Sequence, residues 1–168
     1  MAAFLLVERA GSTPRTGLET PQRGRGYPRL MRLRRDAKVE LLKGVPLFAS
    51  CSKEDLRQIA MLADEVDRDE GRTLIREGER AREFFVVVEG SLRVTRKGDK
   101  VGDLGAGDVV GEIALVTDMP RTATVTTSSP VRLLVLTDRG FRDLLEQSPA
   151  IATKILKSLG ERLHSDAL

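Results

Sequence analysis

Apolar and polar positions follow a helical spacing at both ends of the chain and a strand-like spacing in the middle. Residues 33–42 carry apolar side chains at helical intervals, and so does the segment after Ser52. Ser52 is followed closely by acidic residues, which is typical of a helix N-terminus because these side chains accept hydrogen bonds from free N–H groups. Two helices are therefore expected before the middle region, the second with a buried stripe of Leu56, Ile59, Ala60 and Ala63.

Short apolar segments separated by glycine-containing turns predict β-strands in the middle of the chain. A continuous apolar run, Phe84 to Val88, favours a strand that is covered on both faces. Many short strands at even spacing favour a small closed barrel or jelly roll. We expect an α+β, mainly β fold, with a β block the size of eight strands near residues 63–137. Strands are placed at residues 63–68, 73–76, 84–89, 91–96, 100–104, 123–128 and 132–137.

Helical spacing returns after Thr137. Asp138 is expected to cap a short helix with Phe141, Leu144 and Leu145 inward, and Ser148-Pro149 to end it. A second helix follows, whose apolar stripe is interpreted as core or as a dimer contact. The stripe consists of Ile151, Ile155, Leu156, Leu159 and Leu163.

The first thirty residues differ in composition from the rest of the chain. Residues 1–30 are rich in Gly, Pro, Thr and Arg without an apolar period, which predicts a disordered tail before a domain at 31–168. Residues 1–36 carry eight Arg against three acidic residues, whereas residues 37–168 have a net charge of −2. This basic arm is either a solvated tail or a contact surface for nucleic acid or a membrane. Met31 is an alternative starting residue, so whether residues 1–30 belong to the native protein stays open.

Composition argues against several function classes. The longest apolar runs have about six residues, far below the ~20 that a membrane-spanning helix needs. Cys51 is the single cysteine, so we expect no intramolecular disulfide, a reducing cytoplasm, and a thiol that packs as a small apolar group or lies at a loop surface. His164 is the single histidine, and the glycine-rich loops lack the Lys-Ser/Thr pair of a P-loop. We therefore expect no catalytic site and no metal site.

The segment from Gly111 to Val125 departs from the strand pattern and carries the candidate chemistry. A short helix starting at Glu112 would direct its first N–H groups into the preceding loop, where they form an anion site. Arg121 follows a proline-containing turn, and its guanidinium has a donor fork suited to two oxygens of one phosphate. Glu112 suits a ribose hydroxyl pair, and Ala114 and Ala123 are small enough for close ligand approach. Together these residues predict a nucleotide pocket.

This pattern resembles the phosphate-binding cassette of the cyclic nucleotide-binding domain family. That family includes catabolite activator proteins, protein kinase regulatory subunits and nucleotide-gated channels. The resemblance rests on Gly111 to Leu115 followed, five residues later, by Arg121 to Val125. An upstream stretch matches as well: Leu74 to Glu79, Ala81, Phe84 to Val87 and Gly90. The similarity extends over roughly residues 38–164.

The resemblance implies a fold and a set of roles. The fold is an eight-stranded jelly-roll β-barrel flanked by N-terminal helices and by two C-terminal helices near 138–164. Arg121 would pair with the exocyclic oxygens of a cyclic phosphate, and Glu112 would bind the ribose 2′-hydroxyl. Backbone groups of Gly111, Ile113 and Ala114 would line the cassette, with Ala123 beside it. Thr122 would add a hydroxyl near phosphate and base, which leaves cyclic AMP and cyclic GMP both open as the ligand; no other cofactor is implied.

Two functional hypotheses follow. In the first, the protein is a stand-alone cyclic nucleotide sensor that relays binding through its C-terminal helices to a homodimer partner or an effector protein. Leu156, Leu159 and Leu163 are the candidates for its closing face. No DNA-binding domain is expected, because the sequence stops soon after His164. In the second, the barrel is an interaction scaffold that does not respond to nucleotide.

Overall fold

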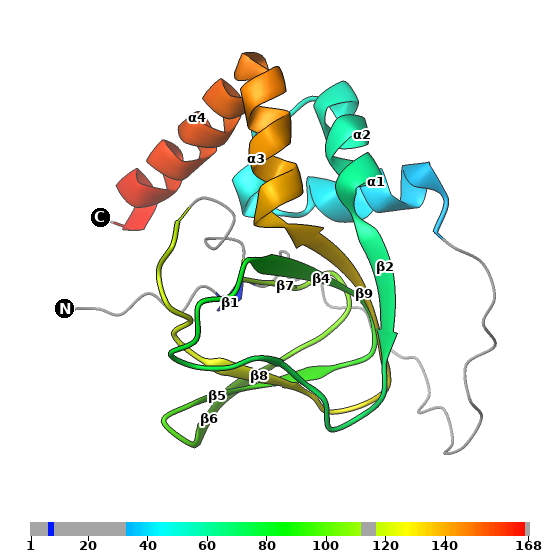
Figure 1. Cartoon of the computed structure of the whole chain (residues 1–168), viewed down its shortest axis with the longest axis vertical. Coiled ribbons are helices and arrows are strands. Elements are labelled where there is room, and N and C mark those ends of the chain that lie inside the picture. Colours follow the sequence, from blue (N-terminus) through cyan, green and yellow to red (C-terminus); the bar gives the residue numbers. More distant parts are fainter. Residues whose placement is uncertain (1–6, 9–32, 112–116, 167–168) are drawn as a thin grey trace.

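A computed structural model describes residues 7–8, 33–111 and 117–166, with the helices gathered at one end of two β-sheets (Figure 1). The N-terminal helical group precedes all strands except the short one at residues 7–8, and the last two helices follow all the strands. The helices are α1 (Arg35–Lys43), the 3-10 helix η1 (Pro46–Phe48), α2 (Lys53–Leu62), α3 (Asp138–Gln147) and α4 (Pro149–Asp166).

The two sheets are antiparallel and together form a jelly roll, which confirms the predicted mainly β fold. One sheet has the strand order β1-β7-β4-β9-β2 and the other has the order β3-β8-β5-β6. Strands β2 to β9 are the eight that the resemblance implies. The strands are β1 (Val7–Glu8), β2 (Asp64–Arg68), β3 (Thr73–Ile75), β4 (Glu83–Glu89), β5 (Leu92–Arg96), β6 (Asp99–Leu104), β7 (Val109–Val110), β8 (Thr124–Thr127) and β9 (Val131–Thr137).

Strand β4 is buried on both faces, as its apolar run predicts. Phe84 and Val86 pack into the cluster that includes the helices, whereas Phe85 and Val87 face the interior between the sheets. Successive side chains of a strand point to opposite faces, so one strand joins the two cores. Full burial of each such side chain stabilises the fold by roughly 1.5–3 kcal/mol.

The N-terminal helices are held by a capping box and by aromatic packing. Ser52 accepts from the Asp55 backbone N–H at 3.2 Å, while the Asp55 carboxylate accepts from the Ser52 N–H at 2.7 Å, which confirms the predicted cap. The Phe48 ring of η1 lies 6.2 Å from that of Phe84 on β4 and 5.9 Å from that of Phe141 on α3, centre to centre. These rings join helices from both ends of the chain to the sheet.

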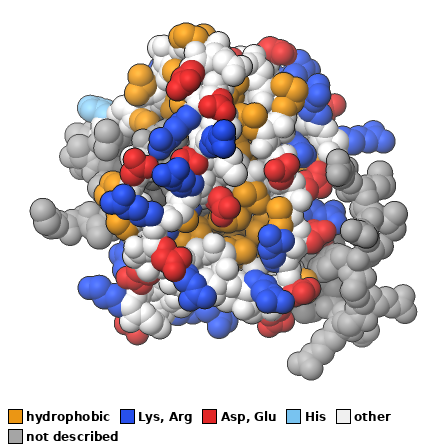
Figure 2. Space-filling model, in the orientation of Figure 1, with side chains coloured by type: hydrophobic (Ala, Val, Ile, Leu, Met, Phe, Trp, Pro, Cys, Tyr) orange, Lys and Arg blue, Asp and Glu red, His pale blue; other side chains and the backbone are white. Residues whose placement is uncertain are grey.

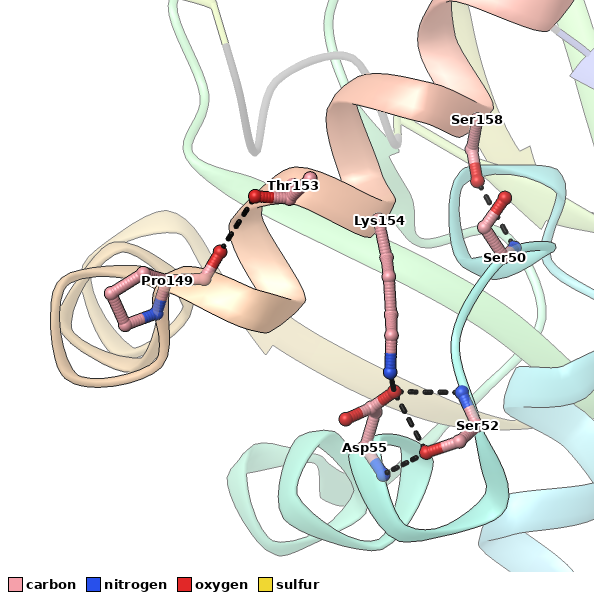
Figure 3. A network of polar contacts seen from close by, with 7 residues as sticks. All are labelled: Ser50, Ser52, Asp55, Pro149, Thr153, Lys154 and Ser158. Carbon is pink, nitrogen blue, oxygen red and sulfur yellow. Dashed lines mark hydrogen bonds and ion pairs between the residues drawn. The ribbon is translucent and has the colours of Figure 1, made fainter.

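Helix α4 docks on the N-terminal helices through polar side chains as well as apolar ones (Figure 3). Lys154 donates to the Asp55 carboxylate at the start of α2, and the buried hydroxyl of Ser158 accepts from the Ser50 backbone N–H at 3.1 Å. Burial opposes ionisation of Asp55, but hydrogen bonds from Lys154 and Ser52 outweigh it and hold its pKa below its ordinary value. The charged form of Asp55 therefore stabilises this docking.

We expect Lys154→Met to lower the free energy of unfolding by about 1 kcal/mol at pH 7, the upper end of the range typical of exposed ion pairs. The Lys154 side chain is 35% exposed, so solvent screens part of the attraction. Since the folded pKa of Asp55 is depressed, its contribution is complete above the unfolded pKa, ~3.9, and is lost as the pH falls through the folded pKa. The difference between wild type and variant should therefore shrink below about pH 4.

Urea unfolding across this pH range measures the effect. Lys157→Met is the matched control, because it removes a more exposed ion pair with Glu161 on the same helix and should change little. If Lys154→Met lowered the free energy of unfolding by the same amount at every pH, the result would contradict the role given to the Asp55 charge.

Four local predictions differ from the structure. Strand β7 was not predicted, because two residues are too few to show an alternating pattern. Val7–Glu8 form β1 against β7, so these two residues of the predicted disordered tail are paired, while the rest of residues 1–30 lies outside the described part. Asp138 was wrongly assigned as a cap: Thr137 caps α3, accepting from Gly140 N–H, and Asp138 is a buried first-turn residue.

The fourth difference concerns the stripe of α4. Ile151 and Ile155 are buried and Leu159 is half-buried, but Leu156 is 69% exposed. Leu156 follows Ile155 directly, and each residue turns a helix by about 100°, so the two cannot share one face. The side chain of Leu163 lies outside the described residues.

The described surface carries charges of both signs. On the face in Figure 2, Lys and Arg are interspersed with Asp and Glu over the helices and the barrel, and apolar side chains gather between these two parts. This face therefore lacks the single-sign field that favours binding of a polyanion. Within the described ranges, no helix combines the length and the apolar character required to span a bilayer.

Candidate functional site

Arg121 lies where the two sheets meet, and its main chain is held there by the segment between β3 and β4. Its N–H donates to the Glu79 carbonyl at 2.9 Å, and its carbonyl accepts from the Gly78 N–H at 2.8 Å. The upstream motif and the cassette motif of the sequence are thus hydrogen-bonded to each other. The Arg121 residue is only 8% exposed.

The guanidinium of Arg121 points at backbone carbonyl groups. Nη1 donates to the Gly111 carbonyl at 3.2 Å and Nη2 donates to the Glu83 carbonyl. The register explains this convergence: Phe85 of β4 pairs with Val110 of β7, so the start of β4 lies beside the residue that follows β7. Nε is buried and has no hydrogen-bond partner among the described residues.

Position 111 requires glycine for two reasons, its backbone conformation and the close approach of Arg121. Its φ is +82°, a region that residues with a Cβ rarely adopt, and a Cβ placed there would lie 2.1 Å from Arg121 Nη1. The same Cβ would lie 3.1 Å from the Glu83 carbonyl oxygen. Glycine therefore allows the guanidinium to approach the backbone.

A buried cation whose hydrogen-bond partners among the described residues are neutral carbonyls favours an anionic ligand. Burial lowers the pKa of Arg121, and the charge of Glu83 partly offsets this. Carbonyl oxygens satisfy two of its nitrogens but supply no full negative charge. A phosphate would supply that charge and could accept two parallel hydrogen bonds from the guanidinium.

A family profile described as "Cyclic nucleotide-binding domain" matches residues 65–148, half of the chain. This chain belongs to the cyclic nucleotide-binding domain family. The family is a regulatory ligand-binding domain, found in kinase regulatory subunits and in the sensor domains of transcription regulators.

Curated relatives cover most of this cyclic nucleotide-binding domain. A cAMP-dependent protein kinase regulatory subunit of Mycosarcoma maydis is 36% identical over 67% of the chain. A cyclic nucleotide-gated potassium channel of Rhizobium etli is 36% identical over 73% of the chain. The chain spans 23% and 34%, respectively, of the lengths of these two relatives.

Solved structures show the same fold. The N-terminal domain of a transcriptional regulator from Streptomyces coelicolor superimposes with a TM-score of 0.70 at 30% identity, covering 75% of this chain and 94% of that domain. A cyclic nucleotide-binding-like protein from Brucella abortus gives a TM-score of 0.61 at 28% identity, covering 65% of this chain and 97% of that one.

The structure brings together some of the predicted ligand-binding residues of the cyclic nucleotide-binding domain. Gly111 and Arg121 are in contact, as described above. Thr122 is exposed, and Ala123 is 7% exposed and packs in the interior between the sheets. Glu112, Ile113 and Ala114 lie outside the described residues, so their assigned roles stay predictions.

Sequence reasoning did not identify the groups that hold Arg121. The Glu83 carbonyl acts through the main chain, so its residue type carries no signal. Gly78 and Glu79 were noted as part of the upstream motif but not as partners of Arg121. Arg96 of β5 was missed as well: its Nε donates to the Thr122 carbonyl at 3.1 Å. A cationic residue at the end of a strand is too common to indicate such a contact.

Other candidate chemistry in the cyclic nucleotide-binding domain is weak. Burial, and secondarily the Asp55 charge, raises the pKa of the Cys51 thiol to about 11, so the reactive thiolate is scarce at neutral pH. His164 is exposed near the end of α4. Across residues 7–8, 33–111 and 117–166, no group of three or more His, Cys, Asp or Glu is placed to hold a metal ion.

Proposed function

We propose that this domain binds a 3′,5′-cyclic nucleoside monophosphate, cyclic AMP or cyclic GMP, with Arg121 as its phosphate ligand. The proposal rests on the Arg121 guanidinium, which is buried, contacts neutral carbonyls and keeps Nε without a partner among the described residues. A desolvated cation gains most from a ligand that brings a full negative charge. The names of the two curated relatives state cyclic AMP dependence and cyclic nucleotide gating, which supports this class of ligand.

The remaining cassette residues take the roles that the family resemblance implies. Glu112 binds the ribose 2′-hydroxyl, and the backbone groups of Gly111, Ile113 and Ala114 line the phosphate site. The exposed Thr122 offers its hydroxyl to the phosphate or the base, and the small buried Ala123 leaves room beside Arg121. Catalytic and metal-binding roles are not proposed for any residue.

The domain acts as a regulatory sensor that relays through α3 and α4 in this proposal. Helix α3 starts at the residue that follows β9, so no loop separates it from the sheet (Figure 1). Helix α4 follows it and docks on η1 and α2. The exposed Leu156 is the proposed contact for a second copy or an effector protein, in a reducing compartment such as the cytoplasm.

A thermal-shift and calorimetric titration with cyclic AMP and cyclic GMP tests the function. A ligand at 100 times its dissociation constant adds ~2.7 kcal/mol to the free energy of unfolding. We expect one or both cyclic nucleotides to raise Tm, and 5′-AMP, which lacks the cyclic phosphate, to have a much smaller effect. No shift with either cyclic nucleotide would overturn the proposal in favour of a scaffold that does not respond to nucleotide.

A further inference from the structure

Four side chains of alternating charge connect the turn before Arg121 to α3. Asp118 Oδ1 lies 3.3 Å from Arg142 Nη2, and this nitrogen lies 3.7 Å from Asp138 Oδ2. Asp138 Oδ2 also lies 3.8 Å from Arg82 Nε. We refer to Asp118, Arg142, Asp138 and Arg82 as the ionic chain.

Both ends of the ionic chain lie next to groups that position Arg121. Asp118 stands three residues before Arg121 in the same turn. Arg82 precedes Glu83, whose carbonyl accepts from Arg121 Nη2. The Arg82 carbonyl also accepts from the Asp138 backbone N–H at 2.7 Å. The first turns of α3 therefore contact both segments that hold the guanidinium.

The inner and outer parts of the ionic chain differ in burial. The Asp138 side chain is 6% exposed, so its charge requires a nearby cation, which both Arg82 and Arg142 provide. The outer pair is open to solvent, with Arg142 47% and Asp118 68% exposed. Met119, which follows Asp118, is 64% exposed, and Asp118 gives this turn an ion pair with α3.

We propose that Arg142 is a positioning residue for the cyclic nucleotide site. Through Asp118 it holds the turn that precedes Arg121 against α3, so that the guanidinium is ordered before the phosphate arrives. Without the pair, the turn must be ordered when ligand binds, which lowers affinity. By thermodynamic reciprocity, bound nucleotide then strengthens the contact between this turn and α3. This role rests on the proposed function, because it requires a ligand at Arg121.

A double-mutant cycle in the 168-residue chain tests the role by calorimetry with cyclic AMP and cyclic GMP. Asp118→Asn removes the charge of the outer pair, whereas Arg142→Gln removes both the outer pair and the Arg142–Asp138 pair and leaves Asp138 with Arg82. Exposed ion pairs change equilibria by about 1.4- to 5-fold, so we expect each variant to raise Kd by about two- to fivefold. The double variant should bind no more weakly than Arg142→Gln alone, because Arg142→Gln already removes the Asp118–Arg142 pair. In 1 M NaCl, where the Debye length is about 3 Å, the differences from wild type should shrink.

Arg57→Gln is the matched control. It removes the Arg57–Glu54 pair of α2, at 3.0 Å and with side chains 42% and 69% exposed, and should leave Kd unchanged. The role of Arg142 is overturned if the wild type binds nucleotide but either single variant binds equally well, or if the two effects multiply in the double variant. Absence of binding by the wild type would instead overturn the proposed function, and this role with it.

Discussion

Arg121→Leu should lower the affinity for cyclic nucleotide by about 30- to 5,000-fold. Removing one partner of a desolvated charge pair typically costs ~2–5 kcal/mol, and this range converts directly into the loss in affinity. The ligand-free protein should remain folded with a similar Tm. The carbonyls of Gly111 and Glu83 lose a donor, but the fold no longer has to bury a cation whose Nε is without a partner among the described residues.

Two further variants test whether binding depends on the paired N–H donors of Arg121, on its charge alone, or on positive charge anywhere on the surface. Arg121→Lys keeps the charge but not the paired donors, so an intermediate affinity is expected. Arg93→Leu removes an exposed barrel arginine, 55% exposed and paired with Asp103 on β6, and should bind like wild type. Near-native affinity of Arg121→Leu in calorimetry would show that the phosphate binds elsewhere.

Gly111→Ala should weaken nucleotide binding by about tenfold or more and destabilise the fold by ~1–2 kcal/mol. The destabilisation comes from the φ of +82°, and the loss of affinity comes from the new methyl group. That methyl would lie 2.1 Å from Arg121 Nη1, so the guanidinium must leave its position beside the cassette.

Gly71→Ala is the matched control for this variant. Gly71 has a φ of +81°, but a Cβ there meets nothing within 4 Å. Both alanines therefore carry similar backbone strain, and only the one at Gly111 contacts Arg121. We expect chemical unfolding to show similar losses of stability and calorimetry to show a loss of affinity in Gly111→Ala alone. Equal affinities in the two variants would contradict the explanation that Gly111 is needed to avoid a clash with Arg121.

Side-chain patterns predicted most of the secondary structure because helices and strands have different periods. The strand at 84–89 was placed within a residue of β4, and its run of apolar residues correctly indicated burial on both faces. Errors arose where the local signal was short or ambiguous. Two-residue β7 shows no period, and Thr137 and Asp138 are both suitable capping residues in adjacent positions, so sequence alone could not choose between them.

The sequence by itself determined the mainly β fold, the family resemblance, and Arg121 and Gly111 as candidate site residues, since residue type and spacing carry this information. Only the tertiary structure decided what surrounds the guanidinium. The Glu83 carbonyl reaches Arg121 because β4 pairs with β7, and Arg142 reaches Asp118 because α3 returns beside the cassette. Backbone carbonyls look alike in every residue, and exposed charges pair with whichever opposite charge the fold brings near. Such contacts depend on how distant segments pack, which no local pattern encodes.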